Sequence, residues 1–196
     1  MAKLPYKITI EGEENMPREG PLIVVSNHSS ALDLFPSCTV RRNRPDMHLF
    51  VTDAVMSSPL KAKLFAQLSG IPVYKAKGLS ITAFITALKY LKQGESVGLA
   101  PEGEMSWDGR LLPFKTGAAW LALKSGAPIC PIWVRGAYDA CPRWSKYPHL
   151  TGKIEIRIGK PFLCSPMGPR KRVEDSLITE CNERIRQEMI ALKRTV

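Results

Sequence analysis

The chain has 196 residues, of which 44% are apolar and 23% charged, which is the composition of an ordinary globular protein with a sizeable core. It contains no run of 18 apolar residues and no apolar signal-peptide core at its N-terminus, so neither a spanning helix nor a secretion signal is expected. The formal net charge of +10 is unusual and favours an anionic partner.

Segments with strand-like and helix-like patterns alternate along the chain. In order, the patterns predict strands at 6–10 and 21–25, a helix at 31–40, a basic loop at 41–44, a strand at 48–51, a helix at 59–68, a strand at 71–74, a helix from Ser80 to Gly94, a strand at 96–100, a helix at 116–124, strands at 127–134 and 153–158, and a helix at 173–189. This order predicts an α/β fold in which a mostly buried parallel or mixed sheet is covered by helices on both faces. One domain over residues 1–196 is expected.

The positive charge is concentrated in two regions. Residues 54–94 contain six lysines and no acid, and residues 140–173 contain eight Lys or Arg residues and one acid. Such patches suit nucleic acid, anionic lipid headgroups or an acidic carrier protein, or they form a basic surface that serves solubility alone. No zinc-ligand spacing, RNA-binding aromatic motif or helix-turn-helix pattern accompanies them, so nucleic acid is not an expected partner.

The most informative segment is Asn27-His28-Ser29-Ser30-Ala31-Leu32-Asp33, directly after the strand predicted at 21–25. A carboxylate that folds back onto a histidine fixes the tautomer of the ring and stabilises its charged form. The other ring nitrogen can then take a proton from a hydroxyl. The sequence therefore predicts that His28 and Asp33 form a catalytic pair.

The same spacing occurs at His48 and Asp53, where it has a different meaning. Those residues begin in a predicted strand, and five extended residues separate the two side chains by roughly 16 Å on opposite faces. Only the pair at His28 is expected to be functional.

A second polar segment, residues 100–115, lies between a predicted strand and a predicted helix. In α/β sheets, ligands bind to loops that leave the carboxyl ends of strands. Gly103 permits a tight turn and close approach of a ligand, and Lys115 can meet an anion. Glu102 can accept hydrogen bonds from a substrate hydroxyl or brace a neighbouring loop. The segment lacks the G-x-x-x-x-G-K-[ST] pattern of a nucleotide-binding loop.

Four motifs in this order resemble those of the glycerolipid acyltransferase family, whose best-known members are the 1-acylglycerol-3-phosphate acyltransferases. They are the N-H-x-x-x-x-D block at 27–33, Gly-Ile-Pro-Val-Tyr-Lys-Ala-Lys at 70–77, Pro-Glu-Gly-Glu-Met-Ser at 101–106 and Pro-Ile-Cys-Pro at 128–131. The resemblance extends from about residue 12 to residue 132.

The resemblance implies an O-acyltransferase of lipid biosynthesis. His28 would deprotonate the hydroxyl of a lysophospholipid, Asp33 would orient His28, and the acyl donor would be acyl-CoA or acyl-carrier protein. No metal and no cofactor are required, and backbone N–H groups near His28 are expected to stabilise the oxyanion. The candidate substrate-binding residues are Asn27, Ser29, Lys75, Lys77, Glu102, Gly103, Ser106 and Lys115.

The third motif departs from the family pattern. The family usually has Glu-Gly-Thr-Arg, whose arginine meets the acceptor phosphate, whereas this chain has Glu102-Gly103-Glu104-Met105. Methionine cannot hold a phosphate, and Lys75 and Lys77 are the nearest cations in the sequence. The altered motif leaves open an acceptor without phosphate, or a non-catalytic module that binds lipid or carrier protein. A serine hydrolase is excluded because no G-x-S-x-G occurs.

The sequence also suggests where the protein resides. Five cysteines without C-x-x-C spacing are expected to be free thiols in a reducing compartment. Together with the basic surface, this predicts a cytoplasmic protein that contacts the inner face of an anionic membrane peripherally. Four aromatic residues can either lie at that interface or pack in the core: Trp133, Tyr138, Trp144 and Tyr147.

Overall fold

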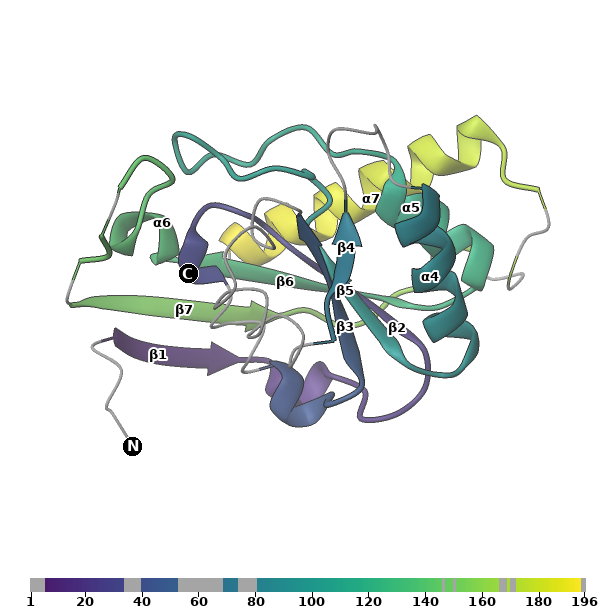
Figure 1. Ribbon diagram of the computed structural model, residues 1–196, viewed down its shortest axis with the longest axis horizontal. Helices are drawn as coiled ribbons and strands as arrows, with labels where there is room; N and C mark the ends of the chain where they lie inside the picture. The colour runs from purple at the N-terminus through teal and green to yellow at the C-terminus, as the bar shows by residue number, and fades with distance from the viewer. Residues whose placement is uncertain are drawn as a thin grey trace.

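The computed structural model describes residues 6–33, 40–52, 69–73, 81–145, 147–149, 151–165, 169 and 172–194. Its frame is a seven-stranded sheet with the strand order β1-β7-β6-β2-β5-β3-β4 (Figure 1). The strands are β1 (Tyr6–Glu11), β2 (Leu22–Ser26), β3 (Met47–Thr52), β4 (Ile71–Val73), β5 (Ser96–Leu99), β6 (Ile129–Arg135) and β7 (Gly152–Ile158). The helices are α4 (Ile81–Lys92), α5 (Gly117–Ser125), α6 (Ala137–Ala140) and α7 (Asp175–Arg194), with 3₁₀ turns η1 (Glu13–Asn15) and η2 (Ala31–Asp33).

The sheet is mixed. β2 lies at its centre and pairs in parallel with β5 and β6, and β3 and β4 continue the parallel part beyond β5. β7 pairs antiparallel with β6 and carries β1 at the edge. The predicted α/β class with a parallel or mixed sheet is therefore confirmed.

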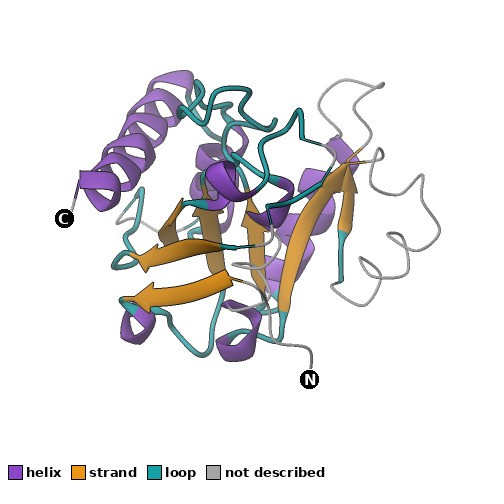
Figure 2. Ribbon diagram, turned by 90° about the vertical axis from the view of Figure 1, so that its left-hand side faces the viewer, coloured by secondary structure: helices purple, strands orange, loops and turns teal. Residues whose placement is uncertain are grey.

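Both faces of the central strand are buried. Ile23 and Val25 of β2 pack in a core that includes residues of α4, α5 and α7, whereas Leu22 and Val24 pack in a second core on the opposite face. This explains the uninterrupted apolar run, because a strand covered on both sides has no solvent-facing positions. The long helices cover one face, and α7 is the long helix that leads to the C-terminus in Figure 2. The second core is closed by short elements such as α6.

A glycine sets the C-terminal end of α5. Gly126 follows it in the left-handed conformation (φ 71°), and the N–H of Gly126 donates to the carbonyl of Ala122. Glycine adopts this conformation without steric cost, which is why it ends helices so often. Thr116 occupies the predicted N-terminal position but makes no side-chain capping bond.

Two predicted segments differ from the structure around residue 40. The described start of the helix predicted at 31–40 is the 3₁₀ turn η2, and residues 34–39 lie outside the described part. The segment predicted as a basic loop is helical over 40–43. The helix predicted at 59–68 also lies outside the described residues.

Arg44, which follows this helical segment at 40–43, points inward and is fully buried. Asp46 binds its guanidinium at 2.6 and 2.9 Å, and the carbonyls of Pro17 and Gly20 accept its other N–H groups.

The expectation of free thiols is wrong for two of the five cysteines. Cys164, beyond β7, forms a disulfide with Cys181 of α7, and their Cα atoms are 5.3 Å apart. No cysteine spacing signals this bond, because it joins a loop to a helix that are brought together only by the tertiary fold. Cys130 and Cys141 are free and buried, and burial raises the pKa of the Cys130 thiol to about 12. Cys38 lies outside the described residues.

Candidate active site

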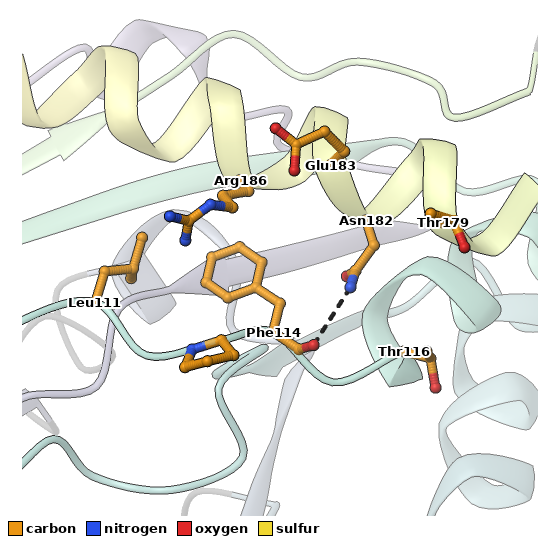
Figure 3. A pocket seen from close by; sticks show the side chains of 8 residues that line it. Leu111, Phe114, Thr116, Thr179, Asn182, Glu183 and Arg186 are labelled. Atoms are coloured by element: carbon orange, nitrogen blue, oxygen red, sulfur yellow. Dashed lines mark hydrogen bonds between the residues drawn. The ribbon is translucent and has the colours of Figure 1, made fainter.

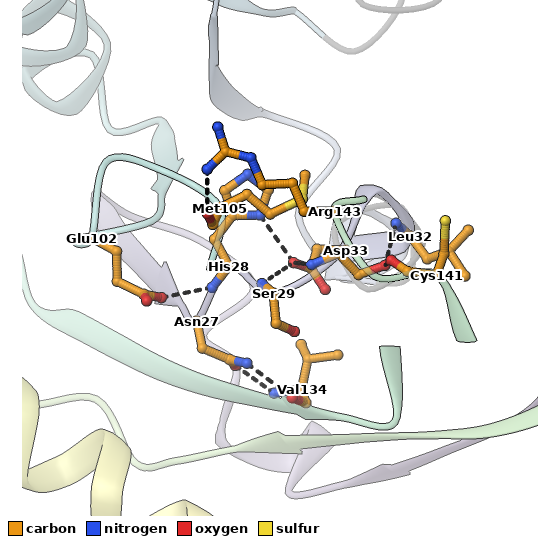
Figure 4. A network of polar contacts seen from close by, with 11 residues as sticks. Asn27, His28, Ser29, Leu32, Asp33, Glu102, Met105, Val134, Cys141 and Arg143 are labelled. Atoms are coloured by element: carbon orange, nitrogen blue, oxygen red, sulfur yellow. Dashed lines mark hydrogen bonds and ion pairs between the residues drawn. The ribbon is translucent and has the colours of Figure 1, made fainter. Parts of the chain in front are cut away.

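Three neighbouring parallel strands end at the same edge of the sheet, and a polar segment follows each of them. His28 follows β2, the loop at 100–116 follows β5, and α6 follows β6. Asn27 holds this edge together: it is 5% exposed, its Nδ2 donates to the carbonyl of Val134 at 2.9 Å, and its Oδ1 accepts the N–H of Val134 at 2.7 Å (Figure 4). The Asn27 side chain thus extends the hydrogen bonding between β2 and β6 beyond the last backbone pair.

The chain turns back after His28, and this brings Asp33 to the imidazole. The Nδ1 atom of His28 lies 3.0 Å from Oδ2 of Asp33, and the same oxygen accepts the N–H groups of Ser29 at 2.8 Å and Ser30 at 2.9 Å (Figure 4). The side chain of Asp33 is 9% exposed and that of His28 is 34% exposed. A proton on Nδ1 satisfies the carboxylate and leaves Nε2 as the basic nitrogen.

The turn itself is anchored to the segment after β6. The hydroxyl of Ser30 donates to the carbonyl of Cys141 at 2.7 Å and accepts the N–H of Leu32 at 3.0 Å. Asp33 is therefore held by the fold rather than by contact with His28 alone.

Glu102 braces two loops. It is 2% exposed; Oε1 accepts the N–H of His28 and Oε2 accepts the N–H of Leu112, both at 2.7 Å. Burial raises the pKa of this carboxyl, while the N–H groups of Leu112 and His28 oppose that shift. Of the two roles considered for Glu102, the structure shows the bracing contact.

Replacing Glu102 by glutamine is expected to lower both stability and turnover. The amide would point an N–H group at a backbone N–H, leaving a buried donor without an acceptor, which costs about 1–3 kcal/mol. We expect urea unfolding to show this loss, and kcat to fall because His28 shifts. Glu104→Gln, at an exposed position of the same loop, is the matched control for stability. Equal unfolding curves for the two variants would contradict the bracing role.

The glycine-containing loop is bound directly to the backbone of His28. The N–H of Ser106 donates to the carbonyl of His28 at 2.9 Å. Gly103 has a left-handed φ of 70°, a conformation that glycine adopts without steric cost, and a Cβ atom there would displace the Lys115 side chain, which lies 2.8 Å away. Ser106 is buried, and its hydroxyl donates to Asp108 at 3.1 Å.

The expected oxyanion donors near His28 are already occupied. The N–H groups of His28, Ser29 and Ser30 all donate to carboxylates. That expectation is therefore wrong for these three groups, because the carboxylates that position His28 also consume the nearest backbone donors.

His48 has a carboxylate partner, but at the other end of the strands. It is 9% exposed near the start of β3, its Nε2 binds the carboxylate of Glu95, and its ring stacks on Tyr90 with centroids 3.5 Å apart. Asp53 lies outside the described residues. His48 is enclosed by protein groups and has the surroundings of a structural histidine.

The structure also brings an arginine to the site that the sequence did not suggest. Arg143, in the segment after α6, donates from Nη1 to the carbonyl of Met105 at 2.8 Å (Figure 4). Its Cζ lies 4.2 Å from the ring centre of Trp107. Lys75 and Lys77, predicted to bind substrate, lie outside the described residues.

A separate pocket of about 380 Å³ lies between the loop at 111–116 and α7 (Figure 3). The apolar wall includes Leu111, Pro113 and Phe114 of the loop. The polar and charged wall includes Asn182, Glu183 and Arg186 of α7. The Nδ2 of Asn182 donates to the carbonyl of Phe114 at 3.4 Å, which connects the loop to the helix.

A histidine whose Nδ1 meets a carboxylate, at the carboxyl edge of an α/β sheet, has the geometry to take a proton from a hydroxyl through Nε2. Residues 7–135 match the model of the family described as Acyltransferase, and the chain belongs to this family. It is 29% identical over 187 residues to a chloroplastic 1-acyl-sn-glycerol-3-phosphate acyltransferase of Brassica napus, covering 94% of this chain and 51% of that protein.

Two other relatives are also named 1-acyl-sn-glycerol-3-phosphate acyltransferases. A chloroplastic 1-acyl-sn-glycerol-3-phosphate acyltransferase of Arabidopsis thaliana is 31% identical over 159 residues, covering 80% of this chain and 44% of the relative. The alpha enzyme of that name from Mus musculus is 30% identical over 174 residues, covering 86% and 60%. The chain thus spans about half the length of the curated relatives it matches. The crystal structure of the 1-acyl-sn-glycerophosphate acyltransferase PlsC from Thermotoga maritima shares the fold, with a TM-score of 0.75 and 24% identity over 98% of this chain and 75% of that chain.

Proposed function

We propose that this protein transfers a fatty acyl group from a thioester to the free hydroxyl of a 1-acylglycerol 3-phosphate. The observation that carries the proposal is the 3.0 Å contact between His28 Nδ1 and Asp33, with the imidazole partly open to solvent. The membership of the family and the names of the relatives supply the reaction and the acceptor class.

The step requires one base and is balanced without a metal or redox cofactor. Nε2 of His28 takes the proton of the acceptor hydroxyl as its oxygen attacks the thioester carbonyl. The tetrahedral intermediate then collapses, the carbon–sulfur bond breaks, and His28 gives its proton to the departing sulfur, which returns the imidazole to its neutral form. Asp33 offsets the positive charge that His28 carries in between. The products are an ester and a free thiol, and no acyl-enzyme forms.

The donor is acyl-CoA or acyl-carrier protein. Both are anionic, and the net charge of +10 favours either by long-range attraction. Both donors present the same thioester to the site, so the chemistry at His28 is the same for either one.

Mass spectrometry of acyl products tests the function. The protein would be incubated with oleoyl-CoA or oleoyl-carrier protein and a panel of lysolipids with and without a phosphate headgroup. A diacylglycerol phosphate as main product supports the proposal. The exposed Glu104 and the Met105 side chain favour a second candidate, transfer to an acceptor without phosphate, and a neutral main product would select it. No product from any combination would favour a non-catalytic lipid or carrier-protein binding module.

A peripheral contact with an anionic membrane at its cytoplasmic face is part of the proposal. Trp107, Trp144 and Tyr147 are 61%, 67% and 70% exposed, and the segment that carries the last two borders the dyad through Arg143. Trp133 does not belong to this surface, because it is buried in the core at 6% exposure. Tyr138 lies beside the surface, and its hydroxyl donates to the carbonyl of Trp107. No helix within the described ranges is long and apolar enough to cross a bilayer.

Trp144→Ala is expected to weaken vesicle binding. Exposed aromatic side chains insert at the headgroup level, and each nearby cation adds about 1 kcal/mol on an anionic surface. Co-sedimentation of this variant with phosphatidylglycerol vesicles should therefore be weaker than that of the wild type. Added salt should also weaken co-sedimentation of the wild type. Leu163→Ala, which removes an exposed apolar side chain elsewhere, is the control. Salt-insensitive binding to neutral vesicles would contradict an electrostatic contact.

A further inference from the structure

We propose that Arg143 binds the phosphate of the acceptor and thereby replaces the cation that the third motif lacks. This inference rests on the proposed function, and it assigns specificity to a residue about forty positions beyond the motif. The phosphate reader would then come from the segment after β6 rather than from the loop after β5.

The first argument is position. The carbonyl of Met105 and the N–H of Ser106 belong to one peptide group. The carbonyl accepts a hydrogen bond from Arg143 at 2.8 Å, and the N–H donates to the carbonyl of His28 at 2.9 Å. The path from the guanidinium through this peptide to the backbone carbonyl oxygen of His28 is about 8 Å long, so the cation is held on the loop segment that is bound to the backbone of the base. Figure 4 shows the bond between Arg143 and Met105 beside the dyad.

The second argument is chemistry. In a 1-acylglycerol 3-phosphate the reacting hydroxyl and the phosphate are on adjacent carbons, so a cation that reads the phosphate must sit near the base. A guanidinium has five N–H donors and suits the bidentate binding of a phosphate. Among the described residues, the hydrogen bond of Arg143 to Met105 uses Nη1, so N–H groups on Nη2 and Nε can donate to a ligand.

The third argument is preorganisation. The guanidinium is held both by the Met105 carbonyl and by stacking on Trp107 at 4.2 Å, although the residue is exposed. A long side chain fixed in this way loses less conformational entropy on binding than a mobile one. Glu104 is exposed in the same loop, and its negative charge makes a compensating cation necessary if the acceptor bears a phosphate.

Steady-state kinetics with two acceptors tests the assignment. 1-oleoylglycerol 3-phosphate and 1-oleoylglycerol carry the same hydroxyl and differ in the phosphate. For Arg143→Ala we expect KM for the first acceptor to rise about 10- to 100-fold, as for loss of a hydrogen bond to a charged group. The kcat, the KM for the donor and the use of 1-oleoylglycerol should stay near wild type. Arg143→Lys should be intermediate, because lysine cannot bind a phosphate bidentately.

Arg184→Ala is the matched control. Arg184 of α7 is also exposed, donates from Nη1 to a carbonyl, that of Leu163 at 2.9 Å, and stacks on an aromatic ring, that of Phe162 at 4.7 Å. Its loss should leave both acceptors unaffected. The double variant Met105→Arg with Arg143→Ala should recover a low KM for the phosphorylated acceptor. A rise in donor KM in place of acceptor KM, or equal behaviour of the two arginine variants, would overturn the inference.

Titration calorimetry without donor separates this inference from the proposed function. Soluble 1-hexanoylglycerol 3-phosphate should bind the wild type and Arg184→Ala, and bind Arg143→Ala about 10- to 100-fold more weakly. Binding that depends on Arg143 without any product would reject the function and keep the assignment. Product formation with unchanged affinity in Arg143→Ala would do the reverse, and a wild type that neither binds nor transfers would reject both. If inorganic phosphate binds as tightly as the lipid, the site reads a free anion and the headgroup assignment fails.

Discussion

Replacing His28 by alanine is expected to lower the rate of acyl transfer by about 10²- to 10⁴-fold, the contribution typical of a positioned general base. Within the residues that the structure describes at this edge, the His28 ring binds a buried carboxylate through Nδ1, and its side chain is partly exposed. The fold should persist, because His28 is tied to Glu102 and to Ser106 through its backbone N–H and carbonyl, which alanine retains. Acyl transfer assays and thermal melts measure the two effects separately.

The control for this variant is His149→Ala. His149 is exposed, and its described contacts use its backbone, so its side chain can be removed without disturbing them. His48→Ala is a poorer control, because His48 is buried between Glu95 and Tyr90 and its loss should reduce stability. If His149→Ala were as damaging to turnover as His28→Ala, the assignment of the base would be wrong.

Asp33→Asn is expected to lower kcat by a similar factor, about 10²- to 10⁴-fold. One carboxylate oxygen of Asp33 accepts from the imidazole and from the N–H groups of Ser29 and Ser30. An amide oxygen can occupy the same place, so the turn should survive. It carries no full negative charge, however, and the imidazolium that forms as the hydroxyl is deprotonated would lose its stabilising partner. An amide turned the other way would present N–H to Nδ1 and impose the wrong tautomer.

Asp139→Asn is the matched control for the loss of one carboxylate. Asp139 is exposed on α6, the helix next to the segment that anchors the Ser30 turn. We expect it to keep wild-type kcat, whereas Asp33→Asn should lose turnover with little change in the midpoint of thermal unfolding. A large drop in that midpoint for Asp33→Asn would mean that its role is to hold the turn, and would remove the support for charge stabilisation.

The parts of this fold that could be predicted are those that local chemistry dictates. An unbroken apolar run predicted β2, alternation predicted β7, and glycine predicted the end of α5. The dyad was also local: two residues five positions apart, joined by a short turn, were placed together correctly. The membership of the family followed from the order of the motifs, and residues 7–135 match the model of that family.

What could not be predicted depends on segments distant in sequence. The bracing role of Glu102 requires the loops after β2 and β5 to meet, and the stacking of Arg143 on Trp107 requires those after β5 and β6 to meet. The pairing of His48 with Glu95 joins β3 to the residue that precedes the neighbouring strand β5. A spacing rule cannot find such contacts, because they are set by strand order, and several strand orders agree with the same sequence of elements.

The backbone bond between Ser106 and His28 also bears on how such a site can evolve. The loop at 102–106 is held by that N–H, by the Glu102 carboxylate and by the glycine at 103, and none of these contacts uses the side chains at 104 and 105. Under the proposed function, single amino-acid changes at those two positions can therefore alter the preferred acceptor while leaving the base in place. A lineage could drift from one acceptor to another by point substitution without passing through an inactive ancestor.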